Sequence, residues 1–490
     1  MTTTFGLPRW LLLWALVLPL AVLIGYLIAV PLAFSSLILL GAISCVLLFP
    51  LFLRWHHAWV IFTWNAALIT FFLPGQPKLG YVVAAASLAV SILHRTLRHE
   101  KRFIQVPAVT RPLVFIAIVV AVTSVVTGGI GGRALGSEAW GAKRYLGVFA
   151  AIIGYFALTA QIIPREKVAR YAGWFILSGL TAAGSDMVYA AGSGFYALFA
   201  LFPVNLAASQ ATTEGTLYRL SGLAFAAQSV CFYLVLKYGL LGLLNLRRPW
   251  RMTTFVVFAI LSLFGGFRSL LIILIIVLSV QFILEGLYKT HWGIMVVLAF
   301  ALLGIGLVSL SDKLPLSVQR SLSFLPLKID PTARRDAAGT LQWRIDMWKV
   351  VMPEVPQYLL FGKGFAFSGT DYYLTQEAQR RGIYLAYEDT LVSGNYHNGI
   401  LTLIIPFGIW GVIGFIWFCW GALHVLYRNF RFGEVSLKHI NTFLFGFFLS
   451  RLTFYILFYG QFDLDLPLFT GVVGISIAVN NGVRSPEPIT

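Results

Sequence analysis

The sequence predicts an all-α polytopic membrane protein with about 14 transmembrane helices and one long, partly helical periplasmic loop. Hydrophobic residues make up 59% of the 490 residues and charged residues only 11%, against roughly 25% charged in an average soluble domain. The apolar runs are also longer than the strands of a membrane barrel, which leaves helices as the spanning elements. Together these observations exclude a cytosolic enzyme, a disordered protein and a disulfide-stapled secreted domain.

The apolar segments divide the chain into an N-terminal bundle at 1–311, a large loop at 312–398 and a C-terminal bundle at 399–490. Within the two bundles, spans are expected at 10–30, 32–53, 58–73, 79–93, 112–127, 145–163, 171–190, 222–244, 252–265, 270–286, 293–311, 399–425, 440–460 and 466–483. Within the loop, segments 338–352 and 370–382 are expected to be helical, because their apolar residues recur at helical spacing or their polar run ends at a glycine.

Basic residues predict the orientation of these spans. If the N-terminus starts inside and the spans alternate, 19 of the 36 Lys and Arg residues fall on the cytoplasmic side and six in short outside loops. The remaining residues lie in the long loop, which does not influence orientation, or within a span. Both termini are therefore expected in the cytoplasm. The net charge of +17 is interpreted as this topology signal, so no nucleic-acid partner is expected.

Histidine placement predicts one candidate for proton transfer. Of the eight histidines, His397 alone is expected on the outer face, where the long loop meets the next span. Histidine titrates near neutral pH and therefore suits a general base, although a helix cap would place it equally well. If His397 is structural, the base is expected among Glu388, Asp389 and Tyr396.

Arginines on the outer face predict an anion site. Arg219 precedes a span, Arg268 follows two glycines between two spans, Arg344 lies in the predicted loop helix, and Arg451 lies inside a span. The guanidinium group stays charged and fits phosphate oxygens in a planar fork, so several such groups facing one cavity suggest a diphosphate. The alternative is snorkelling to lipid phosphates.

Two further motifs are weaker. Gly362 and Gly364 either form a tight turn or allow backbone amides to approach an anion. Asp463 and Asp465 have the D-x-D form used by many metal-dependent sugar transferases, but no histidine accompanies them. No metal site and no cofactor are therefore expected.

Taken in order, these motifs resemble the O-antigen ligase and O-antigen polymerase family. The resemblance covers about 215–415 and is strongest over 340–415. It is carried by Arg219 in R-L-S-G, Arg268 in G-F-R-S, Arg344-x-x-x-Trp348, Pro356 before Gly362-x-Gly364, and His397-Asn398 at the start of a span with Gly408, Gly411 and Gly414.

The resemblance implies an inverting, metal-independent glycosyltransferase of the bacterial inner membrane with its active site on the periplasmic side. The donor would be a glycan on undecaprenyl diphosphate, and the acceptor a lipid-linked glycan or lipid A-core. His397 would be catalytic, and Arg219, Arg268 and Arg344 would bind the diphosphate. Supporting roles would fall to Asn398, Trp348, Gly362, Gly364 and Arg451.

The family contains two activities, and the sequence leaves both open. The long chain and its loop of about 85 residues favour a polymerase of O-antigen or exopolysaccharide repeat units, with a chain-length regulator protein as a candidate partner. The alternative is a ligase that transfers the glycan to lipid A-core. A transporter or flippase of lipid-linked glycans is the alternative of another class, but no internal repeat supports it.

Overall fold

The computed structural model describes residues 17–26, 34–97, 103–128, 130, 139–207, 209–210, 218–382 and 388–485. Its helices are Val17–Tyr26, α2 (Phe34–Thr63), α3 (Leu79–Leu97), α4 (Pro107–Val126), α5 (Ala142–Thr159), α6 (Arg165–Leu177), α7 (Ala183–Ala191), α8 (Ser221–Leu243), α9 (Trp250–Leu263), α10 (Arg268–Leu284), α11 (His291–Leu310), α12 (Leu316–Ser321), α13 (Pro331–Val351), α14 (Val355–Tyr358), α15 (Gly369–Arg380), α16 (Glu388–Ser393), α17 (Leu401–Phe432), α18 (Lys438–Leu457) and α19 (Phe462–Asn480).

Short 3₁₀ helices and strands connect these helices. The 3₁₀ helices are η2 (Ser178–Ala182), η3 (Ser193–Ala200), η4 (Val204–Leu206), η5 (Leu287–Lys289), η6 (Ser311–Lys313), η7 (Met352–Glu354) and η8 (Val435–Leu437). Strand β1 (Ala139–Trp140) pairs antiparallel with β4 (Phe367–Ser368), and β2 (Ser209–Gln210) pairs antiparallel with β3 (Tyr218–Arg219).

The predicted all-helical membrane architecture is confirmed in its class. Within the described ranges, seven helices are long and apolar enough to cross a membrane, and three shorter apolar helices accompany them. These helices make the chain an integral membrane protein. The expected total of about 14 spans, and the side on which each connection lies, remain predictions. The two expected loop helices are present as α13 and α15.

One pair of expected spans differs from the structure in its bounds. The expected spans are 32–53 and 58–73, whereas α2 extends from Phe34 to Thr63 as two helical segments that meet at a kink at Trp55, where the backbone is non-helical, and its second segment ends at Thr63. Residues 64–78 then form turns with an isolated bridge between Ile69 and Lys78. The polar residues near the kink suggested a loop, but their groups are satisfied inside the helical bundle.

Two histidines show how the polar residues near the kink in α2 are accommodated. His56 and His57 were expected in an inner loop, yet both are buried within α2. The Nδ1 atom of His56 lies 2.7 Å from the Ser87 hydroxyl, and Nε2 of His57 lies 2.9 Å from the Leu158 carbonyl oxygen. Hydrogen bonds of this kind offset the cost of burying polar groups in an apolar bundle.

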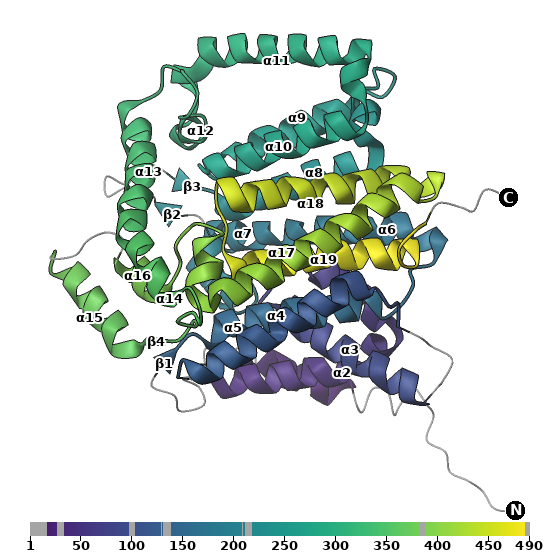
Figure 1. Cartoon of the computed structure of the whole chain (residues 1–490), viewed down its shortest axis with the longest axis vertical. Coiled ribbons are helices and arrows are strands. Elements are labelled where there is room, and N and C mark those ends of the chain that lie inside the picture. The colour runs from purple at the N-terminus through teal and green to yellow at the C-terminus, as the bar shows by residue number, and fades with distance from the viewer. Residues whose placement is uncertain are drawn as a thin grey trace, which may run out of the picture.

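The centre of the bundle is built around α19. This helix packs against α5, α17 and α18, while α4 packs on α17, and the five helices meet in a core rich in phenylalanine. Figure 1 shows α17, α18 and α19 between the group α2 to α5 and the group α8 to α10. Because α19 is surrounded on all sides, residues at its first turn are held rigidly.

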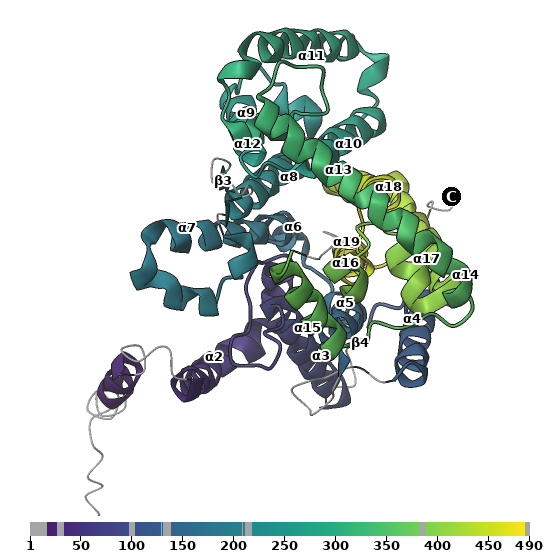
Figure 2. The same ribbon diagram turned by 90° about the vertical axis from the view of Figure 1, so that its left-hand side faces the viewer.

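Helices α12 to α16 and all four strands gather at one end of the bundle, which we call the loop end (Figure 1). Viewed from that end, α13 crosses in front of the bundle helices (Figure 2). Two small apolar clusters hold α13 and α12 in place. One, around Met347 and Tyr396, packs the second half of α13 against the start of α17, and the other, around Leu322 and Leu327, packs α12 against the α9–α10 turn.

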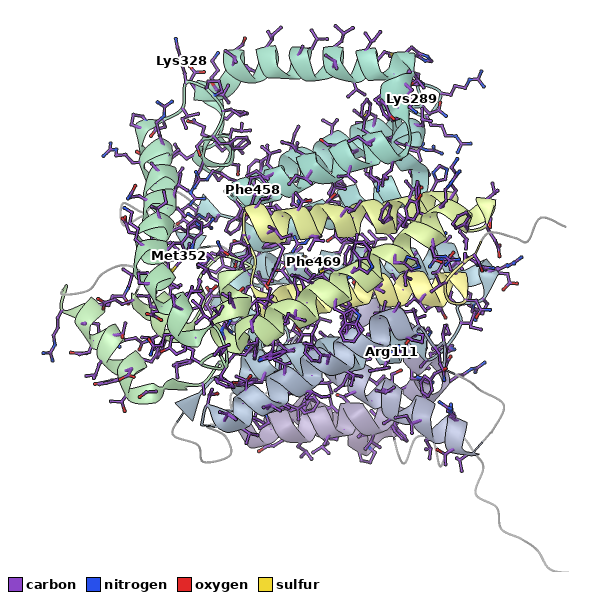
Figure 3. All side chains as sticks on the ribbon, viewed as in Figure 1. Arg111, Lys289, Lys328, Met352, Phe458 and Phe469 are labelled. Atoms are coloured by element: carbon purple, nitrogen blue, oxygen red, sulfur yellow. The ribbon has the colours of Figure 1, made fainter. Side chains whose placement is uncertain are left out.

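The basic-residue bias predicts that the loop end faces the periplasm. Lys328 lies at this end and Lys289 at the opposite end (Figure 3). Cysteines introduced at Lys328 and Thr375 should react with a membrane-impermeant maleimide in intact spheroplasts. Cysteines at Lys289 and Arg431 should react only after permeabilisation, and Cys231 and Cys419 are buried and should contribute little background. Labelling of the Lys289 position from outside would overturn this orientation.

Candidate functional site

One face of α13 organises the candidate site. The residues that make its contacts recur at helical spacing, so they form a single stripe along the helix. The stripe consists of Asp336, Ala337, Thr340, Trp343, Arg344 and Trp348. The helix begins cleanly, because the Asp330 side chain accepts a hydrogen bond from the Thr332 amide and Pro331 occupies the first turn, which are strong start signals.

Three arginines from different elements meet at the first half of this stripe. Arg219 from β3 forms an ion pair of 3.3 Å with Asp336. Arg320, at the end of α12, donates from Nε to the same carboxylate and from Nη2 to the Thr340 hydroxyl at 3.2 Å. Arg268, at the start of α10, donates to the Ala337 carbonyl oxygen at 2.9 Å. One carboxylate therefore faces three guanidinium groups, and the cluster carries excess positive charge.

The electrostatics of this arginine cluster (Arg219, Arg268 and Arg320) favour an anion. Burial, together with the positive charge of Arg320, lowers the pKa of Arg219 to about 10. Burial also lowers the pKa of nearby Arg344, and Arg320 adds to that effect. Arg219 and Arg344 remain protonated at neutral pH, and the mutual repulsion of the arginines is relieved when an anion binds between them.

His397 lies further along the same stripe. Its ring centroid is 5.1 Å from that of Trp343 and 5.3 Å from that of Tyr459. The Arg344 guanidinium lies 5.6 Å from the centre of the Tyr459 ring, so Tyr459 connects the histidine to the arginines. His397 has a φ of 50°, which is uncommon for a residue other than glycine and is typical of functional sites.

The turn around His397 is fixed from several directions. Trp348 donates from Nε1 to the Tyr396 carbonyl oxygen at 2.8 Å. Arg144, at the start of α5, donates to the carbonyl oxygens of Ser393 and Gly394 at 2.9 and 3.1 Å. These bonds hold the histidine in position before a substrate arrives, which lowers the cost of reaching the reactive geometry.

Asn398 and the two loop glycines make contacts within the chain that fix the start of α17. The Asn398 side chain accepts hydrogen bonds from the Ile400 and Leu401 amides, so it caps α17. The amides of Lys363 and Gly364 donate to carbonyl oxygens in the kinked first turns of α17, each at 2.9 Å. The glycine motif is therefore the tight turn, and its amides do not bind an anion.

Both acidic residues of the D-x-D motif are paired with arginines. Asp463 forms an ion pair of 3.2 Å with Arg144, and Asp465 forms one of 2.7 Å with Arg451. Arg451 therefore joins α18 to α19. The carboxylates neutralise buried arginines, which accounts for their place at the end of a buried helix.

The alternative bases are less well placed. Tyr396 is almost completely buried, and burial raises the pKa of its phenol, which disfavours the phenolate that a base requires. Glu388 and Asp389 lie in the first turn of α16, a helix that packs against α15. His397 thus remains the best candidate.

Several residues of the site escaped the sequence reasoning. Arg320, Asp336 and Tyr459 were not singled out, and Arg144 and Trp343 were given no role. Arg320 and Asp336 lie in a loop whose ten basic and nine acidic residues offered no pattern. The helical spacing of Asp336, Thr340 and Arg344 is a signal that could have grouped Asp336 with Arg344, whereas Arg320 lies in a different helix.

The pairing of both D-x-D carboxylates predicts metal-independent activity. Within the described ranges, no group of three or more His, Cys, Asp or Glu side chains is arranged to hold a metal. Transfer is expected to continue in excess EDTA at about the untreated rate. Inactivation by EDTA that Mg²⁺ or Mn²⁺ reverses would contradict this and move attention to Asp463.

The fold and the site define an α-helical membrane protein with a buried basic cluster and a fixed histidine at one end of its bundle. Residues 215–416 match the family model described as O-antigen ligase. This segment contains the arginine cluster, α13 and His397, and the match assigns it to the O-antigen ligase and O-antigen polymerase family, as the sequence motifs indicated. No curated protein matches the chain.

Proposed function

We propose that this protein transfers a glycan from undecaprenyl diphosphate to an acceptor hydroxyl at the periplasmic face of a bacterial inner membrane. The observation that supports this most is the order of groups along α13. From Ala337, which Arg268 contacts, to Arg344 beside Tyr459 the helix advances by about 10 Å. A diphosphate on the arginine cluster would therefore present its attached sugar towards His397.

The residues then divide the reaction between them. The acceptor hydroxyl attacks the anomeric carbon, a new carbon–oxygen bond forms with inversion, and the bond to the diphosphate oxygen breaks. His397 takes the hydroxyl proton, which is the work of a general base. Arg219, Arg268 and Arg344 stabilise the negative charge that develops on the leaving diphosphate. No metal or cofactor is assigned a step.

Polymerisation of O-antigen or exopolysaccharide repeat units is the first candidate, in which a second lipid-linked glycan is the acceptor. Its support is the long chain with its loop of about 85 residues. Ligation to lipid A-core is the second candidate, favoured by the family description that matches 215–416. A chain-length regulator would be a partner only of the polymerase.

A reconstituted assay separates these activities. The purified protein in nanodiscs would receive a lipid-linked repeat unit alone, or the same donor with lipid A-core. A ladder of products from the donor alone supports the polymerase, and modification of lipid A-core supports the ligase. If neither product forms with any lipid-linked donor, the proposed transfer is wrong.

A further inference from the structure

A buried arginine lies at the end of the bundle opposite the loop end. Arg251 belongs to the first turn of α9. Because α9 ends beside α12 at the loop end, this first turn lies at the other end (Figure 1). Arg251 is only 9% exposed. A charged side chain that is buried to this extent requires a counter-ion or hydrogen bonds to all its donors.

The protein supplies only part of that compensation. The Nη1 atom of Arg251 donates to the Gly242 carbonyl oxygen at 3.1 Å, and the guanidinium lies 3.9 Å from the centre of the Tyr238 ring. The Nε atom is buried and has no hydrogen-bond partner among the described residues. One donor of a buried cation is therefore left for an acceptor from outside the protein.

Three further basic residues accompany this arginine. The Nζ atom of Lys237 lies 5.2 Å from the centre of the Tyr238 ring, so Lys237 and Arg251 share that ring. Arg247 and Arg248 are exposed in the turn that leads into α9, and the Arg251 amide donates to the Arg248 carbonyl oxygen at 3.2 Å. We call these four residues the α8–α9 cluster.

Carboxylates do not neutralise the α8–α9 cluster. Residues 215–284 contain no Asp or Glu. Glu285 approaches this junction, but it accepts hydrogen bonds from the Leu240 and Leu241 amides at 2.9 and 3.3 Å, just after the kink at Gly239. Within the described ranges, no ion pair joins a carboxylate to any of the four basic residues. The cluster therefore keeps its full positive charge.

The cluster adjoins apolar and aromatic side chains on the outer surface. Leu246 is 81% exposed and Trp250 is 52% exposed, and the Trp250 ring packs edge-on against Tyr238 with 6.0 Å between their centroids. Tryptophan and tyrosine are enriched where lipid head groups meet the hydrocarbon core. The cluster thus lies at head-group level, at the end of the bundle that the basic-residue bias predicts to be cytoplasmic.

We propose that the α8–α9 cluster binds the phosphate of an anionic phospholipid, with Arg251 as its central ligand. A phosphate oxygen can accept the hydrogen bond that the protein leaves unmade at Nε. Four cations without a carboxylate favour a lipid of net negative charge over a zwitterionic lipid, whose own ammonium group they would repel. The positive end of the α9 dipole adds to this preference, and the exposed apolar side chains favour a lipid over a soluble phosphate.

Native mass spectrometry of the full-length protein tests this site. The detergent-purified protein would be titrated with phosphatidylglycerol and, separately, with phosphatidylcholine that carries the same acyl chains. Phosphatidylglycerol is expected to bind about tenfold more tightly, because only its charge complements the cluster. Equal affinities would overturn the proposal. Displacement of bound phosphatidylglycerol by an equal concentration of inorganic phosphate would identify a site for a soluble anion and would overturn the choice of a lipid.

A substitution at Arg251 locates the bound lipid. Arg251→Gln removes the charge and the Nε donor, so it should abolish the preference for phosphatidylglycerol. The matched control is Lys289→Gln, which removes one positive charge at the same end of the bundle, in η5 and outside the cluster (Figure 3). The control should keep the wild-type preference. A full preference in Arg251→Gln would refute the site.

A second variant covers the case in which Arg251→Gln does not fold, because Arg251 also holds the Gly242 carbonyl oxygen. Lys237→Gln combined with Arg248→Gln changes two exposed residues and leaves the contacts of Arg251 in place. The double variant should weaken phosphatidylglycerol binding by about tenfold, since each basic residue near an anionic head group contributes to the attraction. Unchanged affinity would refute the role of the cluster.

The lipid site and the proposed glycan transfer can fail separately, because His397 lies at the loop end. A protein that transfers glycan but has no preference for phosphatidylglycerol would refute the lipid site alone. A protein that binds phosphatidylglycerol through Arg251 but transfers no glycan would support the lipid site and refute the transferase.

Discussion

Replacing His397 by alanine is expected to slow glycosyl transfer by ~10²–10⁴-fold, the usual loss when an acid–base group is removed. Binding of the donor should change little, because the arginine cluster lies about two helical turns away along α13. The measurement is the single-turnover rate in nanodiscs, with donor binding measured separately by crosslinking.

The backbone at His397 requires a second variant. Its φ of 50° is costly for alanine, by roughly 1–2 kcal/mol, so His397→Ala could lose activity through strain alone. Asparagine tolerates this conformation but cannot act as a base. His397→Asn should therefore be as slow as His397→Ala but as stable as the wild type.

A histidine far from the site gives the control for these variants. His291 is exposed at the start of α11, which places it at the opposite end of the bundle, so His291→Ala should transfer normally. If His397→Asn keeps more than about half of the wild-type rate, His397 is structural. The base must then be sought at Glu388 or Asp389.

Lysine substitutions at the three arginines proposed to bind the diphosphate should cause the second large effect. Lysine keeps the charge but cannot reproduce the planar fork that holds a diphosphate. Loss of one donor at a site of developing charge costs about 2.7–4 kcal/mol, or ~10²–10³ in rate. Arg219→Lys, Arg268→Lys and Arg344→Lys are each expected to show such a loss.

Among these three, Arg344→Lys should be the most informative. The Nε atom of Arg344 has no hydrogen-bond partner among the described residues, and no carboxylate pairs with it there, so its donors are available to a ligand. Arg219 already pairs with Asp336, and its substitution also disturbs that contact. Arg344→Lys thus tests ligand binding with the smallest structural change.

The matched control lies on the same helix. Arg335 is exposed on α13, and Arg335→Lys should transfer at the wild-type rate at equal membrane abundance. Near-normal rates for Arg219→Lys, Arg268→Lys and Arg344→Lys would refute the proposal that these residues bind the diphosphate. That result would fit arginines that only contact lipid phosphates, and it would leave the helical fold unaffected.

The sequence by itself determined the class of the protein and the family of its central segment. An apolar content of 59% with few charges can be accommodated only by a membrane. The order of Arg219, Arg268, Arg344 and His397 then identified the family. The first signal is the composition and the second is the order of motifs along the chain. Both can therefore be recognised without knowing which helices are neighbours.

The helix boundaries were harder to predict from the sequence. Polar residues around Trp55 suggested a loop, whereas α2 continues through them as a kinked helix. Hydrophobicity marks segments that avoid water, but it does not register a histidine whose hydrogen bonds are satisfied by Ser87 or by a distant carbonyl oxygen. Whether the residues around Trp55 form a loop or part of a helix therefore depended on contacts between helices.

Only the tertiary structure decided what each polar motif does. Asp463 and Asp465 resembled a metal motif until the fold placed Arg144 and Arg451 beside them. Arg320 became part of the site because α12 folds back onto α13, which places its guanidinium beside Asp336. The physical reason is that a charge acts over a few ångströms in space, whichever distance separates the residues along the chain. Sequence patterns report the residue types that are present, and folding determines the partners among which they act.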